Sequence, residues 1–182
     1  DYDNMNIVED LSSGQYTITV NDSNSCNEIV HEIFIDEPLP LDVSFNVSSF
    51  NGFNVSCNGE SDGEISVDIE NGLNPNDNYG YNVQWYDSNN NFISDEEDLT
   101  GLAAGTYYLE VDVDIPENEN FIESCSVSET LQITEPNPII ANIDFSNDVS
   151  CFSANDGEIG ISVSGGTGSF SFIWSNGQQS QN

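Results

Sequence analysis

Carboxylates dominate the side chains of this sequence that could bind a ligand or ion. The 182 residues include 33 Asp and Glu, one His and neither Lys nor Arg, which gives a formal net charge of -33. No acidic side chain can therefore pair with a cationic side chain, and solvent, salt or bound cations must relieve the self-repulsion. Ca²⁺ takes about six to eight oxygen ligands from carboxylates, amides and carbonyls. The composition thus favours a divalent cation, with calcium as the expected one.

The candidate calcium ligands fall into two groups of predicted loop residues. In an immunoglobulin-like strand order, the first turn and the end of the last strand lie at one pole, and two other loops lie at the opposite pole. The first group is Glu60 and Asp62 with Glu37 and Glu135, and the second is Asp77, Asp112, Asp114, Glu117 and Glu119. The alternative is that these are ordinary solvated turn residues.

The sequence contains an internal repeat of about 90 to 100 residues, and stacking of successive repeats suggests a more specific arrangement of the calcium ligands. Repeats joined head to tail would bring Glu9, Asp10 and Glu37 of the first unit toward Asp77 and Asp114 of the second. We expect calcium at such a joint to stiffen it. The acidic run at residues 95–98 is instead predicted to be an exposed turn, because neighbouring like charges prefer water.

The four cysteines lie at repeat-related positions rather than in close metal-binding pairs, which favours disulfides and an oxidising compartment. Cys57 with Cys125 is the one pairing inside a complete repeat, and it would add about 4 kcal/mol of stability. In a strict immunoglobulin-like order, however, these two cysteines lie at opposite poles, beyond the roughly 7 Å between Cα atoms that a disulfide allows. The alternative is a disulfide between successive repeats.

Several functions are excluded by the missing residue types. Lysine-dependent phosphate sites, arginine fingers and basic nucleic-acid surfaces cannot form, and anionic membranes would repel the chain. His31 lies between Ile29 and Ile33 in a predicted strand, and its repeat partner is Glu129, so a structural role is favoured over general-base catalysis. We therefore predict no enzyme activity, no nucleic-acid partner and no membrane insertion.

An internal repeat of about 90 to 100 residues organises the chain. The first and second copies share Leu11 and Leu102, Gly14 and Gly105, Tyr16 and Tyr107, and Cys26 and Cys125. The second and third copies share Cys57 and Cys151, Asp62 and Asp156, Gly63 and Gly157, and Trp85 and Trp174. Residues 1–38 are thus predicted to be the C-terminal part of one repeat, 39–138 a complete repeat, and 139–182 the N-terminal part of the next. We expect the parent protein to be longer.

Alternation of apolar and polar residues predicts strands throughout, and nothing has a helical period. The sets facing inward are Ile65, Val67 and Ile69; Tyr81, Val83 and Trp85; Tyr107, Leu109, Val111 and Val113; and, in the third unit, Phe170, Phe172 and Trp174. Tyr107 matches the tyrosine that closes a corner onto backbone in sandwich domains, and Trp85 matches the core tryptophan. The predicted fold is all-β, with immunoglobulin-like or fibronectin-III-like sandwiches arranged head to tail.

The same blocks resemble the SprB-type repeats of giant surface adhesins of gliding bacteria. One block covers residues 54–59 and 62–67, and a second copy runs from Val149 through Cys151 to residues 174–177. A later block covers residues 102–107 and the closing strand that ends at residues 134–136. Long acidic loops at residues 71–80 and 115–124 depart from the family pattern. The resemblance implies secretion to the cell surface by the type IX route and a role in attachment during gliding.

We therefore expect a structural repeat segment of a bacterial cell-surface adhesin or extracellular filament. Its expected partners are neighbouring repeats of the same chain, surface glycans and other filament subunits. One alternative is a carbohydrate-binding module, for which Tyr79, Tyr86 and Tyr108 are the aromatic residues free to contact a ligand. The other is a sheath or surface-layer subunit.

Overall fold

Within the residues that the structure describes, every regular element is a β-strand. The computed structural model describes residues 7–22, 28–72, 80–114 and 125–179, which contain eleven strands in four antiparallel sheets. None of these residues forms a helix of the length and hydropathy needed to cross a membrane. The predicted all-β class is confirmed.

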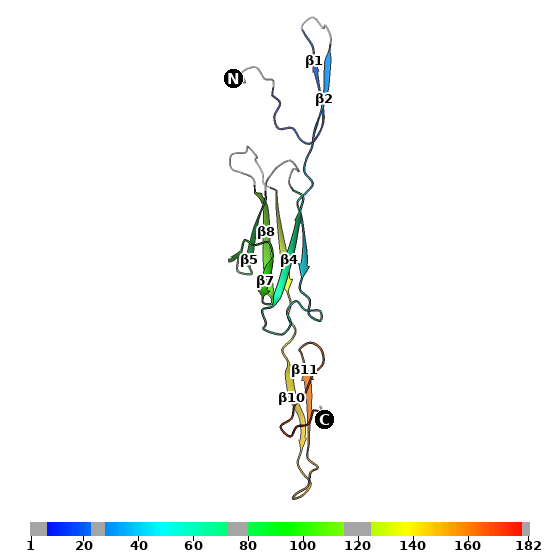
Figure 1. Cartoon of the computed structure of the whole chain (residues 1–182), viewed down its shortest axis with the longest axis vertical. Coiled ribbons are helices and arrows are strands. Elements are labelled where there is room, and N and C mark those ends of the chain that lie inside the picture. Colours follow the sequence, from blue (N-terminus) through cyan, green and yellow to red (C-terminus); the bar gives the residue numbers. More distant parts are fainter. Residues whose placement is uncertain (1–6, 23–27, 73–79, 115–124, 180–182) are drawn as a thin grey trace.

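The middle of the chain forms a sandwich of two sheets, drawn in cyan to yellow-green in Figure 1. One sheet has the order β3–β4–β7, and the other has the order β6–β5–β8–β9. Their bounds are β3 Asp42–Val47, β4 Gly63–Glu70, β5 Gly80–Asp87, β6 Phe92–Ser94, β7 Leu99–Leu102, β8 Gly105–Asp114 and β9 Ser126–Ile133. Counted from β3, the first, second and fifth strands form one sheet, and the other four strands form the second sheet. This is the predicted immunoglobulin-like arrangement.

The core lies between these two sheets. Alternate residues of β4 are buried, and the same period places Val83 and Trp85 of β5 and Val111 of β8 inside. Trp85 has 0% of its surface exposed, as predicted for the core tryptophan. No polar or charged side chain is buried in the described part of the chain. Burial of this apolar surface is the main stabilising term, at roughly 1.5–3 kcal/mol for each large side chain.

A tyrosine corner closes the turn before β8. The Tyr107 hydroxyl donates a hydrogen bond to the carbonyl oxygen of Ala103 at 3.0 Å. Burial raises the pKa of the Tyr107 phenol, which favours its protonated, donating form. The first unit repeats the corner, because the Tyr16 hydroxyl donates to the carbonyl oxygen of Ser12 at 2.8 Å. The predicted corner is therefore present in both copies.

Two-stranded sheets flank the sandwich, one in sequence before it and one after it (Figure 1). The first pairs β1 (Gly14–Val20) with β2 (Ile29–Ile35), and the last pairs β10 (Ile140–Asn147) with β11 (Glu158–Ser164). The proposed boundaries at residues 38 and 138 fall in the segments between sheets. That the flanking hairpins are parts of longer repeats stays a prediction.

The strand predicted through Phe170, Phe172 and Trp174 does not form. Residues 169–174 have no regular secondary structure, whereas the equivalent β5 of the sandwich pairs with β6 and β8. Among the described residues, the third unit contains no counterpart of those two strands. A strand without ladder partners leaves its backbone groups to water, so the apolar pattern alone does not make it regular.

Candidate functional site

The turn at residues 56–62 carries two predicted calcium ligands and is held against the end of β9. The backbone N–H of Gly59 donates to the Glu135 carboxylate at 2.7 Å. The Asn58 side-chain amide donates to the carbonyl oxygen of Pro136 at 3.1 Å. Glu135 is half-buried, whereas Glu60 in the same turn is exposed. The structure therefore brings this turn and Glu135 to one pole, as the strand order predicted.

Asp62 stabilises the turn at residues 56–62 through a hydrogen bond within the turn. Its carboxylate accepts a hydrogen bond from the backbone N–H of Ser56 at 3.0 Å. Hydrogen bonds from the Ser56 side chain and then from the Ser56 backbone lower the pKa of Asp62 below its ordinary value. In the third unit, the Ser150 N–H donates to Asp156 at the same distance, 3.0 Å, and hydrogen bonds from Ser150 likewise lower the pKa of Asp156. One oxygen of each aspartate thus has a structural partner.

The remaining predicted ligands do not converge in the part of the chain that the structure describes. Glu9 and Asp10 are exposed, and Glu37 accepts a hydrogen bond from the Ser13 hydroxyl at 2.9 Å. Asp77, with Glu117 and Glu119, lies outside the described residues, and Asp114 is described only through its backbone pairing with Gly80. No three His, Cys, Asp or Glu side chains gather there into a group that could hold a metal ion. Calcium binding stays a prediction.

The disulfide predicted between Cys57 and Cys125 is not formed in this structure. Both residues, with Cys151, are free and exposed. Cys125 directly precedes β9, and its carbonyl oxygen accepts from Val113 N–H at 3.0 Å. The Cys57 turn lies at the other end of β9, whose eight residues span about 26 Å. That length far exceeds the roughly 7 Å limit between bonded cysteines, so the pairing inside one repeat was wrong.

Aromatic side chains form a partly exposed platform on the four-stranded sheet, on its face away from the core. Tyr86 and Tyr108 are cross-strand neighbours, and Tyr86 meets Phe92 edge to face with ring centroids 6.2 Å apart. Phe92 and Tyr108 are 58% and 37% exposed. The sequence pattern identified the two tyrosines but missed Phe92, whose short strand β6 has too few residues to show a period. Tyr79 lies outside the described residues.

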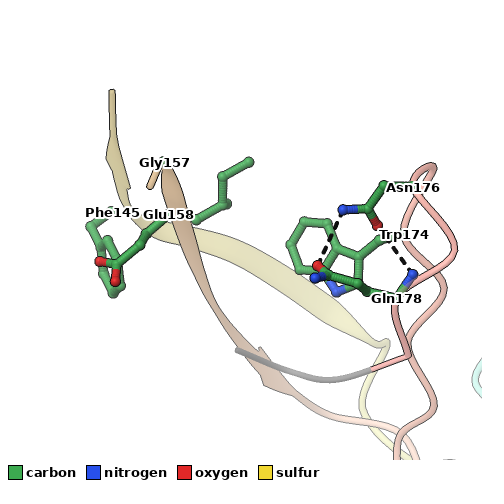
Figure 2. A pocket seen from close by; sticks show the side chains of 7 residues that line it. Phe145, Gly157, Glu158, Trp174, Asn176 and Gln178 are labelled. Atoms are coloured by element: carbon green, nitrogen blue, oxygen red, sulfur yellow. Dashed lines mark hydrogen bonds between the residues drawn. The ribbon is translucent and has the colours of Figure 1, made fainter. Parts of the chain in front are cut away.

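An open cavity of about 410 Å³ lies in the third unit. Figure 2 shows Trp174, Asn176 and Gln178 on one side of it, with Phe145 and Glu158 of the β10–β11 hairpin on the other. Two hydrogen bonds hold Asn176 to Gln178, at 3.1 Å and 3.2 Å. Trp174 is only half-buried, unlike its counterpart Trp85.

The two regions that share the turn, the strand after it and the tryptophan are also the regions that match a protein family. The family model of the SprB repeat matches residues 53–90 and 144–179. Two segments of this chain are similar to the SprB repeat. SprB repeats are structural repeats of cell-surface adhesin-type proteins and not an enzyme family. The resemblance drawn from the sequence is therefore confirmed at the level of the repeat.

The comparisons with curated proteins and with solved structures identify no further family. No curated protein matches the chain. Among solved structures, the three N-terminal domains of the bacteriophage RB49 highly immunogenic outer capsid protein (Hoc) are similar, with 20% identity and a TM-score of 0.48. The match covers 88% of this chain and 53% of that one, so this chain corresponds to about half of the Hoc structure.

A glycine follows Asp62 and also Asp156 in the two matching segments, and packing in the sandwich explains the first of them, Gly63. A Cβ atom at Gly63 would lie 2.9 Å from the Leu102 carbonyl oxygen and 3.3 Å from side-chain atoms of Ile133 and Val55. The first distance is shorter than real Cβ contacts allow, and its partner is backbone. Glycine at this position therefore lets β4 approach β7 closely. The next two residues are Glu64, which is exposed, and Ile65, which is buried in the core.

Proposed function

We propose that this chain is a spacer segment of a bacterial cell-surface adhesin or extracellular filament that serves surface attachment and gliding. The observation that carries the proposal is the sealed core of the SprB-containing sandwich, whose buried side chains are all apolar among the described residues. A catalytic site needs a pocket with convergent polar groups. A sandwich filled in this way is suited to holding distance between a cell and whatever its parent protein binds.

Location outside the cell is part of the same proposal. The excess of carboxylates keeps the surface strongly hydrated and repels anionic membranes. The family's occurrence in cell-surface proteins supports export, with type IX secretion as the proposed route. Protease treatment of intact cells should remove the segment while cytoplasmic proteins survive. Protection of the segment in intact cells would contradict the location.

The spacer role is tested by exchanging the sandwich within the parent protein. Deleting residues 39–138 should reduce attachment, whereas an unrelated β-sandwich of the same length should restore it. The spacer proposal requires length and not the particular surface of these repeats. Loss of attachment in the exchange variant, with normal amounts of protein on the cell, would show that this segment carries the binding surface.

Calcium is the proposed stabilising cation. The net charge of -33 without a single Lys or Arg makes divalent cations the strongest available counterions. Adding Ca²⁺ after chelation should raise the melting temperature more than NaCl of equal ionic strength does. An equal rise of the melting temperature in the two salts would show that calcium acts only by general charge screening. Glu60→Gln, which changes an exposed turn carboxylate, then tests the turn as one ligand source.

Glycan binding is a second candidate function, favoured by the aromatic platform. Tyr86, Phe92 and Tyr108 present ring faces and edges beside polar groups of the same sheet face, including Gln84, whose side chain accepts a hydrogen bond from Tyr86 at 2.7 Å. Partly exposed aromatic rings with a polar group nearby can stack on sugars. A glycan array with Tyr108→Ala tests this role, and Phe50→Ala is the matched control because Phe50 is also 37% exposed. No binding by the unaltered chain would leave the spacer role alone.

A further inference from the structure

The connection between the sandwich and the third unit is hydrogen-bonded along its backbone. Strand β9 ends at Ile133 and β10 begins at Ile140, so residues 134–139 form this connection. Relative motion of neighbouring domains is the default where a linker makes few contacts. The stiffness of this connection therefore depends on which of its backbone groups are bonded, and to which unit.

The sandwich holds the first residue of the connection, Thr134. Its carbonyl oxygen accepts hydrogen bonds from the backbone N–H groups of Asn54 at 2.9 Å and Val55 at 3.2 Å. The side-chain oxygen of Asn54 accepts in turn from the Thr134 N–H at 3.0 Å and from its hydroxyl at 2.8 Å. Both backbone polar groups of Thr134 are thus bonded to the segment that precedes the turn at residues 56–62.

The turn at residues 56–62 holds the next two residues. The Gly59 N–H donates to the Glu135 carboxylate, and the Asn58 amide donates to the Pro136 carbonyl oxygen. The Pro136 ring is also among the side chains with less than 2% of their surface exposed. Residues 134–136 are therefore packed and bonded as part of the sandwich, and we call their contacts with residues 54–59 the exit clasp.

The third unit holds the second half of the connection. The Gly166 N–H donates to the Asn137 carbonyl oxygen at 2.8 Å. Gly166 has a φ of 61°, and a Cβ atom there would lie 2.8 Å from the Ile139 side chain. Glycine is the residue that fits both conditions. Pro138 lies between the two contacted residues and fixes φ at its own position. We call this contact between a glycine and the connection before it the entry clasp.

The sandwich makes the same entry clasp with the connection that precedes it. The Gly72 N–H donates to the Leu39 carbonyl oxygen at 2.9 Å, and a Cβ atom at Gly72 would lie 3.0 Å from the Leu41 side chain. Gly72 also has a positive φ, 72°. The two entry clasps are equivalent in register, because each accepting carbonyl lies three residues before a strand and each glycine lies two residues after that strand's partner.

We propose that the exit and entry clasps together make this joint rigid, so that the sandwich and the unit after it move as one body without a hinge. The exit clasp fixes residues 134–136, and the entry clasp fixes residues 137–139. The two meet at Asn137, whose backbone is restricted to extended conformations because a proline follows it. Every contact is made by the chain itself, so the joint needs no bound cation.

The biological use of a rigid joint rests on the proposed spacer function. Flexible linkers shorten the distance between the ends of a chain, whereas rigid joints keep the full length of each unit. Mobility of the joint and attachment of cells are separate measurements. A mobile joint would therefore remove the rigid connection and leave the spacer role intact.

Backbone amide NMR relaxation of the full chain, in buffer with a calcium chelator, tests the proposal. The N–H order parameters of Thr134 and Asn137 should match those of β8, at about 0.85, the value of a rigid backbone. Gly166→Ala removes the entry clasp and should lower the value at Asn137 below about 0.6 without changing Thr134. Gly168→Ala is the matched control, because Gly168 also has a positive φ, 83°, but open space around it.

Gly72→Ala repeats the test inside the complete sandwich. It should lower the order parameter of Leu39, whereas Gly52→Ala, at a glycine with a φ of 91° and open space around it, should not. The order parameters of β8 in the same spectra show that each variant is folded. Values below about 0.6 at Asn137 in the unaltered chain would overturn the proposal. So would equal effects of the clasp and control glycines, or a joint that becomes rigid only after calcium is added.

Discussion

Replacing Ile65 by alanine should destabilise the sandwich strongly, whereas the same replacement at Ile159 should not. Ile65 is 1% exposed and belongs to the buried cluster around Trp85. Truncating a buried isoleucine to alanine costs about 2–5 kcal/mol, because it removes apolar contacts and leaves a cavity. For a domain near 100 residues, each kcal/mol lowers the melting temperature by roughly 4–8 °C. We therefore expect Ile65→Ala to melt at least about 8 °C lower.

Ile159 is the matched control, because it holds the equivalent repeat position with 50% of its surface exposed. Its replacement should leave the melting temperature of the sandwich unchanged. The assay is thermal or denaturant unfolding followed by the fluorescence of Trp85, in a Trp174→Phe background that removes the second tryptophan. A low protein concentration prevents self-association from contributing to the fluorescence signal. Equal losses for the two variants, or a loss below about 1 kcal/mol for Ile65→Ala, would refute the packing described above.

Three smaller changes test individual contacts. Tyr107→Phe removes the hydrogen bond to Ala103 and should cost about 0.5–1.5 kcal/mol in denaturant unfolding; no loss would show that the corner contributes nothing net. Gly63→Ala should destabilise the sandwich because its Cβ would meet backbone, whereas Gly80→Ala, with open space around it, should not; matching effects would contradict the close approach of β4 and β7. The pKa of Asp62 is depressed on folding, so its stabilising contribution is present above the ordinary carboxyl pKa and disappears as the pH falls through the folded value. The stability gap between the unaltered chain and Asp62→Asn should therefore narrow below about pH 4, and a constant gap would contradict this assignment.

Much of the sandwich could be predicted from the sequence because its signals are local. Alternation identified the inward side of β4, β5 and β8, and the tyrosine and tryptophan identified their places in the fold. Repeat spacing then carried these assignments to Tyr16, whose corner the structure confirms. Each of these predictions depends on residues close together in the chain or on direct equivalence between copies.

Predictions that depended on long-range distance were less successful. The repeat suggested a disulfide between Cys57 and Cys125, but the two cysteines lie at opposite ends of β9 and are both free. The apolar pattern at residues 170–174 predicted a strand, but regular pairing requires neighbours that the described part of the third unit does not contain. Tertiary partners, and not the local pattern, decide both outcomes.

Candidate ligand residues were the hardest to predict. Acidic side chains are so numerous that their positions in the sequence do not distinguish a metal ligand from a turn acceptor. Asp62 shows the difficulty, since its carboxylate caps the Ser56 N–H within its own turn. Phe92 joined the aromatic platform only through pairing between β5 and β6.

Native-state hydrogen exchange on the dilute full chain most directly tests the central claim that the sandwich closes its own core while the flanking hairpins remain open. Backbone amides of β4, β5, β8 and β9 should exchange only through global unfolding of the sandwich, as expected for core strands. Amides of β1–β2 and β10–β11 should exchange orders of magnitude faster, because each pair is a two-stranded sheet whose apolar face is exposed. Uniform protection from β1 to β11 would contradict the account, since it would require a single cooperative core along the chain.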